Sequence, residues 1–251
     1  MTRVHACLAA LLACVSCRSG DPAPSMSAAS VARGPGATGS SRITGVVSFH
    51  GPVPAFREPV APFPECGQRT PQDPLRVSAA GQVANAFVYV RDGLAPGDYP
   101  LPPEPVLLDQ KACDYQPRVF GIRAGQTLLV RNSDNVLHNV HARGAGAGLA
   151  GGPDAFNVAM PVQGGTVKRN FPEPQVPVAI GCDVHPWMRA FAGVVTHPFF
   201  AVTGDDGAFS LGGLPAGTYT LEAWHERLGR TSAQVTVGAD QTQLVQLEFK
   251  P

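Results

Sequence analysis

A cysteine, a histidine and a methionine follow one another at intervals of three residues in the segment GCDVHPWMRAF, at Cys182, His185 and Met188. Thiolate, imidazole and thioether groups are the donors that soft and borderline metals prefer, copper above all. A thiolate, two imidazoles and one more distant thioether together make a blue-copper site. One more histidine is therefore needed, and His138 in NSDNVLHN is the best candidate. The residue types and their spacing predict a copper site.

The alternation of side chains along two expected strands supports this set. Successive side chains of a β-strand point to opposite faces. Cys182 continues the row of Ile180, so it should face a core, and His138 shares a face with Val140, whereas His141 takes the other face. A lone inward histidine is more often a hydrogen-bonded core residue than a ligand, so the nearby loop carries this prediction.

The segments that must position these residues have the pattern of short β-strands. The chain holds 28 glycines and 25 prolines in 251 residues, and no stretch keeps a helical periodicity for more than two turns. About eight short apolar segments with turn signals between them lie within residues 106–198, a pattern typical of a β-sandwich. We therefore expect an all-β fold.

The loop GCDVHPWMRAF resembles the ligand loop of amicyanin-type cupredoxins, in which Cys-x2-His-x2-Met has proline directly after the histidine. The segment DYQPRVFGIRAGQTLLVRNSDNVLHN resembles the earlier half of the plastocyanin family. These resemblances imply a cupredoxin Greek-key β-sandwich at residues 99–198 that binds one type-1 copper ion. They imply that Asn139 steadies the ligand loop, in the family by backbone hydrogen bonding to the thiolate. The implied copper ligands are His138, Cys182, His185 and Met188.

The resemblance also implies a route for electrons. In cupredoxins the loop histidine reaches the surface through an apolar patch, and here Pro186 and Trp187 flank His185. Trp187 is thus expected beside the cofactor at the electron-exchange surface. Ordinary packing of Trp187 between loop and sandwich is the alternative. The sequence departs from the family at Gly181, where an aromatic residue is common.

A second β pattern surrounds this domain. The motif TGDDGAFSLGGLPAGTYTL in residues 199–251 resembles the carboxypeptidase regulatory-like domain, a transthyretin-like sandwich. That family opens with a strand, a Gly-Pro turn and another strand, which GVVSFHGPVP and AFVYV match in residues 42–98. We expect 42–98 and 199–251 to form one discontinuous sandwich. The alternative is that the first segment adds strands to the cupredoxin.

The N-terminus predicts export. A short apolar run follows one arginine, which is typical of a signal peptide at residues 1–17. LLAC at residues 11–14 resembles a bacterial lipobox, so Cys14 is the expected lipidation site, with Cys17 as the alternative and ordinary secretory cleavage also open. Residues 18–41 are rich in Gly, Ser, Ala and Pro, as in a flexible tether. We expect a lipid-anchored protein of the periplasm or the cell surface.

The cysteines divide into two sets. Three of the six lie in the N-terminal region, which leaves Cys66, Cys113 and Cys182 for the folded part. In an oxidising compartment two of these can pair. A Cys66–Cys113 disulfide with Cys182 as the metal thiolate is the economical assignment, and it would link the two sandwiches. Two free buried thiols are the alternative.

Composition and the remaining motifs limit the function. The formal net charge is zero and no basic stripe is present, so we expect no nucleic-acid partner. No nucleophile elbow, HExxH motif or phosphate loop occurs, so we expect no enzyme activity. The neighbours in Trp224-His225-Glu226 point to opposite faces of a strand and cannot easily share one ligand. A one-electron carrier with a redox protein as partner is the expected function. Copper storage or delivery, or a surface-binding module, is the alternative.

Overall fold

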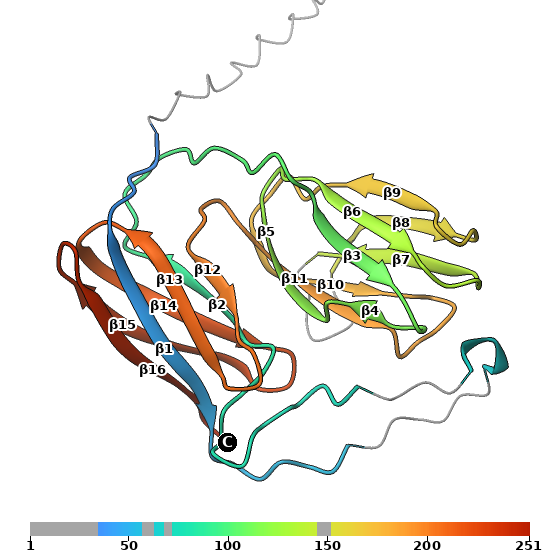
Figure 1. Cartoon of the computed structure of the whole chain (residues 1–251), viewed down its shortest axis with the longest axis horizontal. Helices are drawn as coiled ribbons and strands as arrows, with labels where there is room; N and C mark the ends of the chain where they lie inside the picture. The colour runs from blue at the N-terminus through green and yellow to red at the C-terminus, as the bar shows by residue number, and fades with distance from the viewer. Residues whose placement is uncertain (1–34, 57–62, 68–71, 145–151) are drawn as a thin grey trace, which may run out of the picture. The chain divides into compact units, whose positions relative to one another are not determined.

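The chain folds into two β-sandwiches, and each consists of two sheets (Figure 1). This computed structural model describes residues 35–56, 63–67, 72–144 and 152–251. The expected signal peptide, Cys14, Cys17 and most of the expected tether lie outside the described residues. The prediction of an all-β fold with two β units is confirmed. Among the described residues, no helix has the length and apolar character needed to cross a membrane.

The central sandwich pairs a five-stranded sheet, in the order β5-β11-β10-β7-β8, with a four-stranded sheet, in the order β4-β3-β6-β9. The β3–β6 and β5–β11 pairs are parallel, and the other pairs are antiparallel. Its strands are β3 (Val106–Gln110), β4 (Tyr115–Gln116), β5 (Val119–Arg123), β6 (Leu128–Asn132), β7 (His138–Arg143), β8 (Asp154–Met160), β9 (Thr166–Arg169), β10 (Gln175–Gly181) and β11 (Arg189–Val195).

The flanking sandwich contains strands from both sides of the central one. One sheet has the order β13-β1-β16, and the other has the order β12-β2-β14-β15. β1 pairs with β13 and β16, and β2 pairs with β12 and β14, so strands that precede the central sandwich pair with strands that follow it. Its strands are β1 (Ser41–Phe49), β2 (Phe87–Asp92), β12 (Phe200–Val202), β13 (Ala208–Leu214), β14 (Gly217–His225), β15 (Gly229–Val237) and β16 (Thr242–Phe249).

Period-two alternation builds both cores. Ile180 at the end of β10 is buried, and Cys182 two residues later is buried as well. In the flanking sandwich, Tyr219, Leu221 and Ala223 of β14 enter one apolar cluster. Alternation therefore explains which side chains leave the solvent, since one face of each sheet must be covered.

A third, smaller apolar cluster joins residues of both sandwiches, among them Phe87, Phe191 and Trp224. Beside it, the buried guanidinium of Arg118 donates two hydrogen bonds to the Glu226 carboxylate, at 2.5 and 2.8 Å. The carboxylate of the Trp224-His225-Glu226 motif therefore has a cationic partner. Its structural role accounts for the motif without a second metal.

Candidate metal centre

Three of the expected ligands meet at one end of the central sandwich. His138 begins β7, Cys182 follows β10 directly, and His185 lies in the loop that leads to β11. One donor atom of each lies within 4.8 Å of the other two. All three side chains are buried, and both histidines are fully so. Residues 47 positions apart in the chain are thus brought together by the pairing of β7 with β10.

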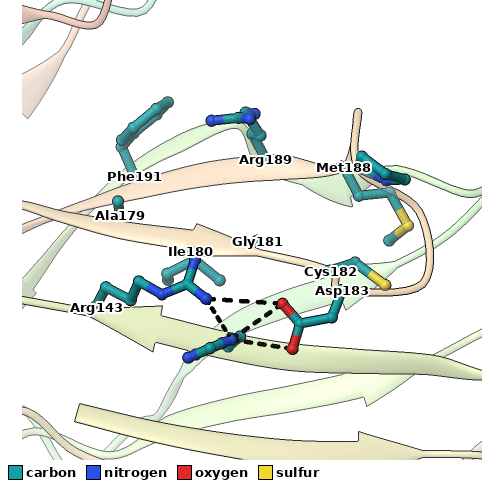
Figure 2. A pocket seen from close by; sticks show the side chains of 11 residues that line it. Arg143, Ala179, Ile180, Gly181, Cys182, Asp183, Met188, Arg189 and Phe191 are labelled. Atoms are coloured by element: carbon teal, nitrogen blue, oxygen red, sulfur yellow. Dashed lines mark hydrogen bonds and ion pairs between the residues drawn. The ribbon is translucent and has the colours of Figure 1, made fainter. Parts of the chain in front are cut away.

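Three hydrogen bonds within the loop between β10 and β11 hold its shape. The Cys182 N–H donates to the Met188 carbonyl at 3.3 Å, and the Met188 N–H donates to the His185 carbonyl at 2.9 Å. The His185 N–H donates to the Cys182 sulfur at 3.4 Å. Met188 is fully buried in the same loop (Figure 2), so the fourth expected donor is also withdrawn from solvent.

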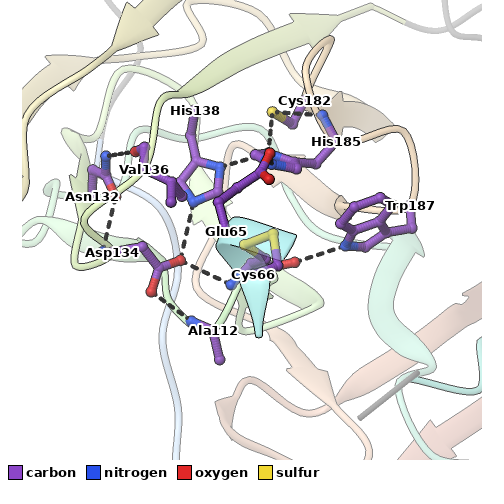
Figure 3. Close-up of a disulfide and its surroundings, with 11 residues drawn as sticks. Glu65, Cys66, Ala112, Asn132, Asp134, Val136, His138, Cys182, His185 and Trp187 are labelled. Atoms are coloured by element: carbon purple, nitrogen blue, oxygen red, sulfur yellow. Dashed lines mark hydrogen bonds and ion pairs between the residues drawn. A yellow bond between two sulfur atoms is a disulfide. The ribbon is translucent and has the colours of Figure 1, made fainter. Parts of the chain in front are cut away.

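The two imidazoles face each other through their Nδ1 atoms, which are 2.9 Å apart. The opposite nitrogen of His138, Nε2, lies 3.0 Å from an Asp134 carboxylate oxygen. Backbone N–H groups of Ala112 and Cys113 donate to that carboxylate as well (Figure 3). Since a carboxylate accepts, His138 carries its proton on Nε2 and leaves the Nδ1 lone pair toward His185.

His185 is placed as a neutral ligand would be. Its Nδ1 lies 3.7 Å from the Cys182 sulfur. Burial lowers the pKa of His185, and the neighbouring His138 lowers it further. The neutral imidazole is the form that binds metals. Two facing nitrogen lone pairs repel each other unless a proton or a metal lies between them, so this group fits a bound ion.

Asn139 connects the loop to two strands through its side chain. Its amide oxygen accepts the Asp183 N–H at 2.6 Å, and its amide nitrogen donates to the Asp183 carboxylate at 2.9 Å and to Asn157 at 2.8 Å. The Asn139 carbonyl accepts from the Tyr115 hydroxyl at 2.6 Å. Asn139 thus holds the residue next to Cys182, whereas the resemblance implied a backbone hydrogen bond to the thiolate.

His141 lies on the opposite face of β7 from His138, as the alternation predicts. It is buried all the same, by a polar network that sequence reasoning missed. Its Nδ1 lies 3.0 Å from Asp183, and its Nε2 lies 2.7 Å from Asp154. Burial alone would raise the pKa of Asp183, but hydrogen bonds from His141, Asn157 and Asn139 lower it. The network therefore satisfies His141 with carboxylates and leaves it outside the sulfur-containing group.

A pocket of about 490 Å³ lies beside this network (Figure 2). Gly181 lines it, and a Cβ at that position would meet only the Met188 carbonyl, at 3.9 Å. The glycine that replaces the common aromatic residue therefore leaves open space next to the loop. The lining residues are His141, Arg143, Ala179, Ile180, Gly181, Cys182, Asp183, Pro186, Met188, Arg189 and Phe191.

His185 does not reach the surface, which departs from the family expectation. The segment Phe63–Gly67, which contains the 3-10 helix η1 (Pro64–Cys66), covers it. The Phe63 ring lies 5.2 Å from the His185 ring and 4.7 Å from the Trp187 ring, centroid to centroid. Trp187 is half-buried, and its indole N–H donates to the Cys113 carbonyl at 2.9 Å. Trp187 thus packs between its own loop and the covering segment Phe63–Gly67.

A disulfide between Cys66 and Cys113 attaches this covering segment to the turn between β3 and β4 (Figure 3). Cys182 is the free cysteine of the described residues. Because Cys66 and Cys113 are bonded to each other, the buried thiol of Cys182 remains available beside two histidines. The covering segment itself had no sequence signal beyond its cysteine.

No protein-family model matches the chain, and no curated protein matches it either. Solved structures do match. A mutant of amicyanin with Cu(I) is 21% identical over 36% of this chain and 81% of its own length, with a TM-score of 0.31. A purple cupredoxin from Nitrosopumilus maritimus is 22% identical over 36% and 98%, with a TM-score of 0.30. A copper-containing nitrite reductase from Thermus scotoductus SA-01 is 22% identical over 41% and 25%, with a TM-score of 0.31.

Proposed function

We propose that this chain is an exported blue-copper protein that carries single electrons. The observation behind this proposal is the buried group in which two imidazole nitrogens and one thiol sulfur lie within 4.8 Å of one another. Soft and borderline metals choose that donor set, and a buried thioether in the same loop favours copper over zinc. Bound copper would supply one-electron oxidation and reduction. The proposed ligands are His138, Cys182, His185 and Met188.

The chain's own residues would prepare this centre before any ion arrives. Asp134 holds His138 in the tautomer that offers Nδ1. Asn139 fixes Asp183, and through it the start of the loop. The His185 N–H directs a donor at the Cys182 sulfur. A ligand set that is already arranged rearranges little during electron exchange, which suits a carrier.

Copper storage or delivery is the second candidate. The covered position of His185 favours it, because a docked redox partner would meet Phe63 and Glu65 before the imidazole. A carrier would need exchange through this cover, whereas a storage protein gains from it.

Addition of cupric ion to the metal-free protein separates the two candidates. A carrier develops an intense visible band from thiolate-to-copper charge transfer, and ascorbate bleaches the band reversibly. Cys182→Ser is the matched control, since it keeps the shape and removes the thiolate. No band, together with tight binding of cuprous ion alone, would select storage or delivery.

We also propose that the exported chain is lipid-anchored at Cys14 and that its partner is a redox protein. We propose further that the flanking sandwich is a transthyretin-like accessory module without enzyme activity. The lipobox-like LLAC supports the anchor, and the motif in residues 199–251 supports the module. Mass spectrometry of the mature N-terminal peptide tests the anchor. An acylated cysteine at position 14 supports it, and an unmodified N-terminus after residue 17 contradicts it.

A further inference from the structure

The Cys66–Cys113 disulfide lies directly against the candidate metal centre. One sulfur of each cysteine and one nitrogen of His185 lie within 4.8 Å of one another. Figure 3 shows the disulfide beside the rings of His138 and His185, next to Glu65. A disulfide that only links two segments does not require an imidazole beside it. Its neighbours are therefore the feature to explain.

The two nitrogens of His185 face different surroundings. Nδ1 faces His138 and Cys182, as described above. Nε2 is buried and has no hydrogen-bond partner among the described residues. It lies 3.8 Å from the Glu65 carboxylate, on the side of the covering segment. An unpaired buried ring nitrogen is costly. When the neutral ring carries its proton on Nδ1, between the two facing imidazoles, Nε2 offers a lone pair that a metal ion can accept.

We infer that Cys66, Cys113 and His185 form a second copper site when the disulfide is reduced. In the disulfide each sulfur is bonded to the other and is a poor ligand. Two thiolates with the His185 Nε2 make a donor set that selects cuprous ion. Glu65, whose side chain is 42% exposed, lies at the edge of this outer site, where its charge attracts a cation. The inference rests on the proposed copper function, which it extends with an entry position for the metal.

The reduction that opens the outer site is a thiol–disulfide exchange with a dithiol protein. One thiolate of the dithiol attacks a sulfur of the disulfide, the sulfur–sulfur bond breaks, and a mixed disulfide forms. The second thiol of the partner then displaces the remaining cysteine. Two electrons and two protons pass to Cys66 and Cys113, and the partner leaves as a disulfide. Metal binding then releases the protons of the two thiols.

The experiment uses the full chain with Cys182→Ala, because this change removes the inner thiolate. The variant is reduced with a phosphine, freed of reductant without oxygen, and titrated with cuprous ion against a chromophoric chelator. The oxidised form of the same variant is the matched control, since it keeps His138, His185 and Met188. We expect the reduced form to bind cuprous ion at least about tenfold more tightly than the oxidised form.

Two further variants locate the binding. Adding Cys66→Ser and Cys113→Ser should return the affinity to that of the oxidised control, and His185→Ala should lower it by about tenfold. Equal affinities of the reduced and oxidised Cys182→Ala forms overturn the inference, and this comparison does not depend on the folding of the serine variants. The visible band of oxidised wild-type protein tests the blue-copper proposal separately, so either proposal can fail without the other.

Discussion

Each sandwich buries a histidine at the end of a strand, and only one of the two lies in a group of side chains that could hold a metal ion. His138 begins β7 of the central sandwich, and His225 ends β14 of the flanking one. His225 Nδ1 accepts the Arg227 N–H at 3.2 Å, and its ring packs against Phe249. Its other nitrogen has no hydrogen-bond partner among the described residues. Burial therefore does not distinguish the two histidines.

The neighbours of His138 and His225 distinguish them. Burial lowers the pKa of His225 to about 4, and the nearby cations of Arg118 and Arg227 contribute. Cations repel a metal ion as they repel a proton. His138 faces a carboxylate on one side, and a second imidazole and a thiol on the other. Convergent donors without adjacent cations are what make a buried histidine a candidate ligand.

The largest effect is expected from removal of the Cys182 thiolate, which has no counterpart beside His225 in the flanking sandwich. Cys182→Ser should abolish the charge-transfer band, because that band requires the thiolate. His225→Gln should leave the band unchanged. Absorption spectra of both variants after cupric addition check the pair, with circular dichroism as a control for folding. A full band in the Cys182→Ser variant would show that Cys182 is not the copper thiolate.

The second-largest effect is expected from acid, which should lower the stability of the fold by protonating His225. The pKa of His225 is about 4 in the folded protein and near 6.5 when unfolded. Between these values the unfolded state binds the extra proton, so stability falls as the pH falls from 6.5 to 4. The expected loss is about 3 kcal/mol at most. In a Trp187→Phe background, Trp224 fluorescence during urea unfolding at pH 7 and pH 4 measures it. Burial also lowers the pKa of His197 to about 4, so that histidine keeps its own share of the loss. His225→Gln should remove only the His225 share, and an unchanged loss would contradict the assignment.

Two histidines of a single strand give the next comparison. His138→Ala should weaken cupric binding by about 100-fold, because it removes a ligand. His141→Ala should change the affinity little and destabilise the fold by about 1–3 kcal/mol, because Asp183 and Asp154 lose their buried partner. Competition titrations and urea unfolding measure the two quantities. Equal losses of affinity would contradict the prediction that His138 is a ligand and that His141 is not.

The smallest expected effect concerns Asp134. Asp134→Asn keeps the shape but leaves the His138 tautomer less fixed, so cupric affinity should fall by about tenfold. Asp154→Asn is the matched control on the other face of β7 and should leave affinity within about twofold. The same competition titration measures both. An affinity that is equally insensitive to both would indicate that the tautomer is fixed by other contacts.

Alternation and residue type predicted much of this molecule. The all-β fold and the opposite faces of His138 and His141 follow from period two, which is a local property of the chain. The pairing of Cys66 with Cys113 is present in the structure, although the sequence had left two free thiols open. Donor chemistry singled out the loop because sulfur and nitrogen ligands are rare so close together.

What the sequence did not predict depends on contacts between distant segments. The cover over His185 comes from Phe63–Gly67, more than a hundred residues away, and no periodicity relates the two. The network around His141 depends on the register that sets β7 beside β8 and β10. Short polar residues such as Asp183 and Asn157 carry no signal of their own until that register is known. The direction of Asn139's hydrogen bonds has the same cause.

The position of bound copper would decide whether these four side chains are its ligands. Crystals of the copper-loaded protein, measured on both sides of the copper absorption edge, locate the ion by its anomalous signal. We expect one strong peak among His138 Nδ1, His185 Nδ1 and the Cys182 sulfur, with the Met188 thioether beside it. A peak at the His141 network instead, or none among the four proposed ligands, would contradict it.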